Sequence, residues 1–167
     1  NRVETIRATT SFLMADSTTP DGDYIKPQTN PTNTDCWNGK AYTPLNQLTP
    51  GRTKYGTNNN VRIFRYADVL LMNAEAKIKN GKSGDAPFNE VRRRAQMPEL
   101  TNVTFEQVID ERRMELVCEW GERYNDLVRT GLAKTELKGW SEDKALLPLP
   151  FNQYTQIPDL LKEPKDE

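Results

Sequence analysis

The sequence predicts a mainly α-helical fold in which helical pairs are joined to long irregular loops. Apolar residues recur at spacings of three and four from Val61 onward, the period of an amphipathic helix. Start and stop signals divide this region into helices of ordinary length. Residues 1–60, by contrast, are dominated by Thr, Asn, Asp, Pro and Gly, which are typical of loops. A chain of 167 residues has room for one such domain.

The first two predicted helices form a pair. The first begins at Val61, carries apolar residues to Ile78 and meets the stop signal Asn80-Gly81. The second begins near Asp85 and ends before Pro98. Because the connection between them is short, we expect the two helices to be antiparallel neighbours.

A third helix is expected to begin at Thr104, whose hydroxyl can cap it while Gln107 reaches back, and to run to Gly121. A shorter helical piece follows and is ended by Gly131. Stacked helical pairs of this length are the units of tetratricopeptide-type repeats. Because about three repeats are needed to bury their faces, we expect this segment to be the end of a larger array.

Composition divides the chain into three parts. Residues 1–60 are a loop-rich segment with at most short strands and a possible ligand-facing surface. Residues 61–150 are the helical region. Residues 151–167 are a C-terminal strap and tail, and the prolines just before them, Pro148 and Pro150, predict an extended strap over the helices.

The composition also excludes several function classes. The sequence contains no histidine, which removes the commonest general base and the usual zinc ligand. The net charge of −1 gives no general attraction for nucleic acid or anionic lipid. Cys36 and Cys118 are too few for a disulfide scaffold or a four-thiolate metal site; they could pair, but a buried thiol is the better interpretation of Cys118. We expect no cofactor.

Two carboxylates fall on the apolar face of the first predicted helix. With Phe64 at zero on a helical wheel, Asp68 lies at about 40° and Glu75 at about 20°, in the same sector as Leu71. A buried carboxylate stays ionised only beside a cation and hydrogen-bond donors. We therefore predict at least one ion pair between helices that joins an arginine to Asp68 or Glu75.

A row of acids on the third helix allows two interpretations. Glu111, Glu115 and Glu119 follow one another at four-residue spacing and could be metal ligands or an acid–base pair. A di-iron bundle needs Glu-x-x-His, however, and a glycosidase needs one protonated carboxyl in an open cleft, whereas nearby arginines lower carboxyl pKa values. The sequence favours structure over catalysis, with no catalytic residue and no metal site. The expected ion-pair network is Asp68, Glu75, Arg92, Arg94, Arg112, Arg113, Glu115 and Arg123.

Five motifs follow one another along the second half of the chain. They are RYADVLLMNAEA (65–76), FNEVRRRA (88–95), DERRMEL (110–116), EWGERYNDLVRTG (119–131) and LPLP (147–150). In this order and spacing they resemble the C-terminal region of the SusD/RagB family. The resemblance covers roughly residues 60–150.

This resemblance implies a mostly helical, tetratricopeptide-containing lipoprotein on the outer face of a Gram-negative outer membrane. Such proteins capture glycans or other nutrients without enzymatic activity and act as a lid on a SusC-like, TonB-dependent transporter. The implied partners are that transporter, a glycan or oligosaccharide, and an N-terminal part of the same protein that carries the lipid anchor. The alternative is a tetratricopeptide-like protein-interaction scaffold without a glycan ligand.

Sugar recognition requires flat aromatic faces flanked by Asn, Asp or Arg side chains. Within the loop-rich segment, the candidate ligand-binding residues are Asp35, Trp37, Asn38, Tyr42 and Tyr55. The competing interpretation of Trp37, an anchor that packs the loop onto its own core, has the greater weight. Trp120 lies among helix residues and is expected in the core.

Overall fold

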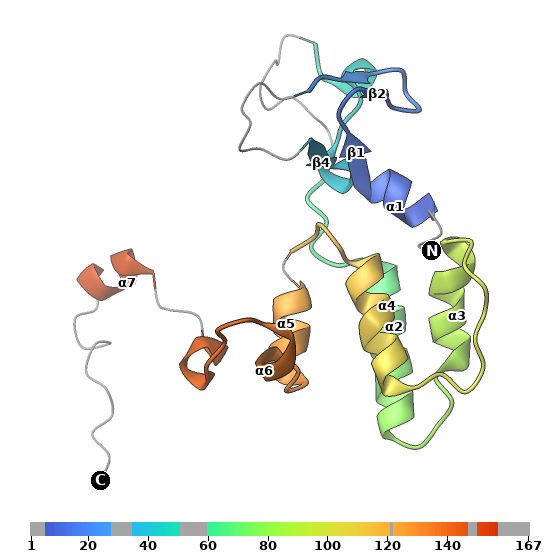
Figure 1. The fold of residues 1–167 in the computed structure, drawn as a ribbon, viewed down its shortest axis with the longest axis vertical. Coiled ribbons are helices and arrows are strands. Elements are labelled where there is room, and N and C mark those ends of the chain that lie inside the picture. The colour runs from blue at the N-terminus through green and yellow to red at the C-terminus, as the bar shows by residue number, and fades with distance from the viewer. Residues whose placement is uncertain (1–5, 28–34, 51–59, 121, 147–149, 157–167) are drawn as a thin grey trace. The chain divides into compact units, whose positions relative to one another are not determined.

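The computed structural model describes residues 6–27, 35–50, 60–120, 122–146 and 150–156. The chain forms two compact units, residues 1–123 and 124–167. It is mainly helical, as the sequence predicts (Figure 1). In the part of the chain that is described, no helix combines the length and the apolar character needed to cross a membrane. The division into residues 1–60, 61–150 and 151–167 rests on composition and stays a prediction.

Three helices build the core of the first unit. Helices α2 (Tyr66–Lys79) and α3 (Asp85–Arg94) form the antiparallel pair, and α4 (Phe105–Glu115) packs beside α2 (Figure 1). Their apolar faces meet in one cluster that removes the side chains from water, which stabilises the arrangement. The buried members of the cluster are Ala67, Leu70, Leu71, Ala74, Phe88, Val91, Val103 and Val108.

Helix α2 begins later than predicted. The helix starts at Tyr66 instead of Val61, and Phe64, expected on the buried face, lies before it with 76% of its side chain exposed. From Ala67 onward the predicted face is correct, because Leu71 is fully buried. The end is also as predicted: Gly81 follows the helix with φ of +68°, a left-handed conformation that glycine adopts without a steric penalty.

Helix α4 begins as predicted and ends early. The Thr104 hydroxyl accepts from the Gln107 backbone N–H at 3.3 Å, and the Gln107 side chain accepts from the Thr104 N–H at 2.9 Å, which completes a capping box. The helix ends at Glu115, short of Gly121. Trp120 is therefore outside the helix and 64% exposed, so its predicted place in the core is wrong.

Removal of this cap has a defined expected cost. Thr104→Ala deletes the hydroxyl that satisfies one N–H of the first turn, so we expect the free energy of unfolding to fall by about 1 kcal/mol. Urea denaturation followed by circular dichroism measures it. Thr101→Ala, at an exposed position outside the helix, is the matched control and should leave the midpoint unchanged. Equal effects of the two substitutions would argue against the cap.

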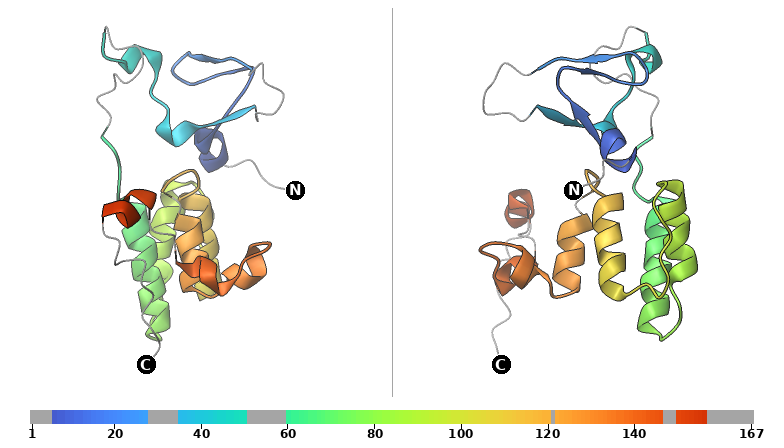
Figure 2. Two further views of the ribbon diagram at one scale, coloured as in Figure 1. Left: turned by 90° about the vertical axis from the view of Figure 1, so that its left-hand side faces the viewer. Right: turned by 45° about the vertical axis from the view of Figure 1, so that its right-hand side comes forward.

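The N-terminal segment contains short strands, as expected, and one helix that was not predicted, α1 (Ile6–Ser11). The strands in the described ranges have two or three residues each: β1 (Phe12–Met14), β2 (Ser17–Thr18), β3 (Tyr24–Ile25) and β4 (Cys36–Asn38). β1 pairs antiparallel with β4, and β2 with β3. Figure 2 shows α1, β1 and β4 together on one side of the unit.

Two 3₁₀ turns, η1 (Gly39–Ala41) and η2 (Leu45–Gln47), follow β4. Turn η1 packs so closely on α1 that only glycine fits at its first position. A Cβ atom on Gly39 would lie 2.2 Å from the carbonyl oxygen of Thr10. This close approach fixes the position of the next residue, Lys40.

The described part of the second unit is built from short elements. α5 (Glu122–Arg129) begins at the end of the first unit and continues into the second, where α6 (Ala133–Glu136), the 3₁₀ turn η3 (Glu142–Ala145) and α7 (Phe151–Gln156) follow. Gly131, with φ of +75°, follows α5 at its predicted end. Residues 151–156 are helical, which the sequence did not predict. Pro148 lies outside the described residues.

Candidate functional site

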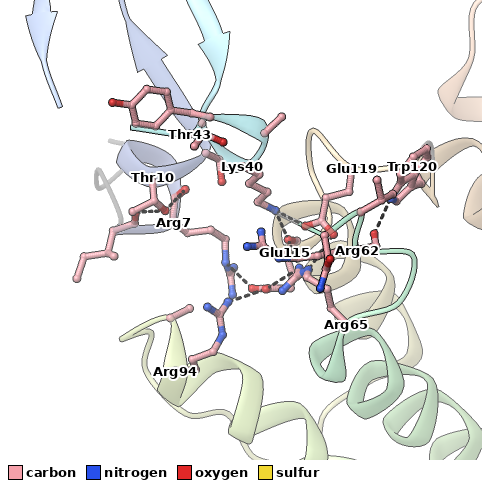
Figure 3. A pocket seen from close by; sticks show the side chains of 18 residues that line it. Arg7, Thr10, Lys40, Thr43, Arg62, Arg65, Arg94, Glu115, Glu119 and Trp120 are labelled. Atoms are coloured by element: carbon pink, nitrogen blue, oxygen red, sulfur yellow. Dashed lines mark hydrogen bonds and ion pairs between the residues drawn. The ribbon is translucent and has the colours of Figure 1, made fainter. Parts of the chain in front are cut away.

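A ladder of carboxylates on α4 faces cations from several other segments of the first unit. The carboxylates belong to Glu111, Glu115 and Glu119, the last lying just beyond the helix end. Figure 3 shows Arg7, Lys40, Arg65 and Arg94 around Glu115 and Glu119. The partners are Arg7 of α1, Lys40 of η1, Arg65 at the N-cap of α2, and Arg92 and Arg94 of α3.

Glu115 is the centre of the ladder. Its side chain is only 1% exposed, and three guanidinium groups contact its carboxylate. Arg94 lies 2.6 Å and Arg65 2.9 Å from Oε1, while Arg7 Nε lies 3.1 Å from Oε2. A carboxylate so deeply buried requires this compensation to stay ionised.

The neighbouring acids extend the ladder in both directions. Glu111 accepts from Arg7 at 2.6 Å and from Arg92 at 2.7 Å. Glu119 accepts from Lys40 at 2.7 Å and from Arg65 at 2.8 Å. Because one guanidinium can bond two carboxylates, these contacts connect α1, η1, α2 and α3 to α4.

The two acids predicted on the buried face of α2 are both buried. Asp68 accepts from Arg112 of α4 at 2.6 Å, which is an ion pair between two helices. Glu75 pairs with Lys79, one turn along the same helix, at 3.1 Å. In both cases a cation compensates the buried carboxylate.

The remaining arginines named from the sequence differ in position. Arg123 is half-buried near the start of α5. Arg113 is exposed, and within the described ranges it forms no ion pair with these acids. Successive side chains on a helix lie about 100° apart around its axis. Arg112 therefore points toward α2, and Arg113 points to solvent.

The network changes the acidity of two of its members. Burial raises the pKa of Glu119, but hydrogen bonds from Arg65 and Lys40 outweigh it and hold the pKa below its ordinary value of 4.5. Burial lowers the pKa of Arg65, and the hydrogen bonds to Glu119 and Glu115 more than reverse this. Glu119 is therefore a carboxylate at neutral pH, without a proton to donate.

This shift predicts a pH dependence of stability. Because the folded pKa of Glu119 is depressed, its stabilising contribution is present above the ordinary pKa and is lost as the pH falls through the folded value. We expect the urea midpoint to fall below about pH 4.5, and Glu119→Gln to reduce that dependence. Glu90→Gln, at an exposed position on α3, is the control. An unchanged pH profile in Glu119→Gln would contradict the assignment.

The network forms one wall of a cavity of about 670 Å³. Arg7, Lys40, Arg65 and Arg94 line it together with Glu115 and Glu119 (Figure 3). Arg62, Trp120 and Tyr42 line it as well. The Trp120 indole N–H donates to the Arg62 carbonyl oxygen at 2.6 Å, which fixes the ring beside the cavity.

One described candidate for ligand binding lines this cavity. Tyr42 is half-buried, and its hydroxyl donates to the Asp23 carboxylate and lies 3.3 Å from the Thr19 hydroxyl. Burial raises the pKa of Tyr42, and the hydrogen bond to Asp23 acts in the same direction. Tyr55 lies outside the described residues.

The other three candidates lie on or beside β4 and are not among the residues that line the cavity. Trp37 is half-buried and stands opposite Leu13 in the β1–β4 pair. Asn38 accepts from the Lys40 N–H at 2.9 Å and donates to the Cys118 carbonyl at 2.8 Å, so its amide is used in the loop structure. Asp35 is exposed just before the strand.

The two cysteines are free thiols. Cys36 lies in β4 and Cys118 in the turn after α4, and each is partly exposed. The buried position expected for Cys118 is therefore not found. Its φ of +64° takes the backbone out of the helical path.

Sequence reasoning missed the partners of the ladder that lie outside α2, α3 and α4 or at the N-cap of α2. Arg7, Lys40 and Arg65 belong to a short unpredicted helix, a 3₁₀ turn and a cap residue, where no periodic pattern marks a buried side. The available signal was indirect. Glu111, Glu115 and Glu119 required more cations than one neighbouring helix could bring close to them.

Comparison with known proteins identifies the family. The SusD family matches residues 6–159, which is most of the chain. The chain belongs to the SusD family. The match confirms the resemblance found in the motifs of residues 60–150, and it also includes residues before and after that range.

Two curated SusD-type relatives are similar to parts of the chain. SusD-like protein P38 of Formosa agariphila is 33% identical over an alignment of 119 residues, and the match covers 60% of this chain and 24% of that protein. The starch-binding protein SusD of Bacteroides thetaiotaomicron is 36% identical over 81 residues, which are 48% of this chain and 14% of that protein. The matched part is thus a quarter or less of each relative.

Solved structures of SusD-like proteins share the fold. Surface glycan-binding protein A from Bacteroides thetaiotaomicron is 29% identical with a TM-score of 0.73, over 93% of this chain and 37% of that one. Surface glycan-binding protein A from Bacteroides uniformis is 27% identical with a TM-score of 0.71, over 94% and 37%. A SusD-like protein from Bacteroides fragilis, at 21% identity and a TM-score of 0.66, agrees in fold. The predicted fold class is confirmed.

Proposed function

We propose that the protein containing this chain captures glycans at the cell surface, without enzymatic activity, and delivers them to a SusC-like, TonB-dependent transporter. One observation carries the proposal: the chain belongs to the SusD family and shares its fold with two surface glycan-binding proteins at 27% and 29% identity. A curated relative named as a starch-binding protein points the same way.

The chemistry of the α4 acids supports binding over hydrolysis. A glycosidase keeps one carboxyl protonated beside a second that is ionised. Here Glu115 is covered by three arginines, and Glu119 has a depressed pKa. These groups are suited to hold α4 in place and are poorly suited to protonate a leaving group.

The exposed apolar residues at the start of α2 support a packing partner. Each of these residues is between 43% and 76% exposed, and this many exposed apolar residues within one short segment favour a partner that covers them. We assign the partner to the N-terminal part of the same protein, which would also carry the lipid anchor at the outward face of the outer membrane. The residues are Val61, Ile63, Phe64, Tyr66, Val69 and Met72.

The ligand-binding residues stay a proposal. Tyr42 has the strongest support because it lines the cavity. We also propose Trp37 and Asp35 as ligand-binding residues, because Trp37 is partly exposed and Asp35 is exposed on the loop-rich segment. Asn38 and Tyr55 complete the set inferred from the sequence.

The proposal is tested by measuring binding of the complete protein to a glycan panel by isothermal titration calorimetry. We expect at least one polysaccharide to bind without being hydrolysed, and the protein to co-purify with a large outer-membrane barrel. Failure of every glycan, with binding of peptides instead, would indicate a protein-scavenging role.

A second candidate is a tetratricopeptide-like scaffold that binds a protein and no glycan. The stacked helices and the exposed residues of α2 favour it. Recovery of a soluble partner in place of an outer-membrane barrel, together with no glycan binding, would select this alternative.

A further inference from the structure

The cavity beside the ladder has an excess of positive charge. Its wall carries five cationic side chains and two carboxylates, and the carboxylate of Glu115 is already covered by guanidinium groups. In a partly enclosed space such an excess attracts anions more strongly than it would in open water. The cationic members are Arg7, Lys40, Arg62, Arg65 and Arg94.

Two of these cations have donors to offer a ligand. Arg94 contacts Glu115 through one nitrogen, and its side chain is 61% exposed. Arg62 is exposed, and among the described residues its guanidinium forms no ion pair. A guanidinium has five N–H donors in a planar fork that matches a carboxylate or a sulfate.

Trp120 adds an aromatic surface at the same place. Its ring is 64% exposed, and its N–H is held by the Arg62 carbonyl oxygen, so the ring position is coupled to the segment that carries the Arg62 side chain. A large exposed aromatic ring that lines a cavity is a common feature of ligand sites, and its apolar face suits the C–H face of a sugar ring.

We propose that this cavity binds an acidic saccharide, with its carboxylate or sulfate on Arg62 and Arg94 and its sugar ring against Trp120. The inference rests on the proposed capture of glycans and names the chemical class of the ligand. The volume of about 670 Å³ falls in the range of small-molecule sites and suits a short oligosaccharide.

The test compares three probes on the complete protein by calorimetry: an oligogalacturonide, a sulfated carrageenan oligosaccharide and a neutral galacto-oligosaccharide of the same length. We expect at least one acidic probe to bind about tenfold more tightly than the neutral one, and less tightly as NaCl rises from about 50 to 500 mM. Arg62→Gln should weaken acidic binding about three- to tenfold. Arg113→Gln, an exposed cation on α4 outside the cavity, should not.

Two results would overturn the inference. If the neutral probe binds as well as both acidic probes, or if Arg62→Gln and Arg113→Gln have equal effects, the cavity does not select anions, while the proposed glycan capture stands. If none of these probes and no member of the wider glycan panel binds, the proposed function fails as well. Because Arg62 is outside the ion-pair ladder, its replacement leaves the fold intact, and circular dichroism verifies this.

Discussion

Replacement of Glu115 by glutamine is expected to lower the free energy of unfolding by about 3–5 kcal/mol, because it leaves three guanidinium groups without their shared counter-charge. Glutamine has nearly the same volume, so the loss comes from charge and hydrogen bonding. Arg7 and Arg65 also form ion pairs with Glu111 and Glu119, so these two guanidinium groups keep one counter-charge each. Urea denaturation monitored by circular dichroism measures the change.

The matched control is Glu90→Gln, which removes a carboxylate from an exposed position of α3. We expect its effect to be within about 0.5 kcal/mol of zero. A Glu115→Gln protein as stable as the Glu90→Gln protein would show that the buried carboxylate is not a structural element.

The second large effect is expected at the ion pair between α2 and α4. Asp68→Asn removes the charge that faces Arg112 at 2.6 Å, and the Arg112 side chain is only 4% exposed. Glu122 stays 3.9 Å from Arg112 in this variant, but loss of the nearer counter-charge beside so deeply buried a guanidinium should lower the free energy of unfolding by about 3 kcal/mol. The same denaturation experiment detects it.

A double-mutant cycle separates the pair from its surroundings. Arg112→Met removes the other partner, and the double variant Asp68→Asn with Arg112→Met removes both charges. Because no unpaired charge remains at this contact, we expect the double variant to be less destabilised than the sum of the single variants by about 1–3 kcal/mol. Additive effects would mean that Asp68 and Arg112 do not stabilise each other.

Much of the helical part could be predicted because its signals are local and periodic. The face of α2 that buries Leu71 follows from the helical repeat, and so does the inward position of Asp68. The capping box at Thr104 could be recognised from two residues. The errors lie at helix ends, where Phe64 continues an apolar pattern that the backbone does not follow.

The exposed position of Trp120 could not be predicted from the sequence, for a different reason. The residues after Glu115 continue the pattern of an amphipathic helix without glycine or proline before Gly121. The backbone nevertheless turns at Cys118, which adopts φ of +64° without being glycine. Because no sequence signal marks such a residue, the cavity beside Trp120 could not be predicted.

The partners of the ladder were beyond sequence reasoning for another reason. Arg7 reaches Glu111 across 104 residues, and Lys40 reaches Glu119 across 79. Neither cation lies on an element with a periodic pattern. Charge balance predicts that partners exist but does not say which arginine or lysine supplies them.

We propose that the acids of α4 hold the fold together and that a bound glycan is contacted by other side chains and not by these carboxylates. A crystal structure of the complete protein with a bound glycan tests it most directly. We expect Glu115 to remain within hydrogen-bond distance of at least two guanidinium groups, and no sugar atom or metal ion to contact Glu115 or Asp68. A structure in which these carboxylates gather around an ion or contact the glycan at its glycosidic bond would contradict it.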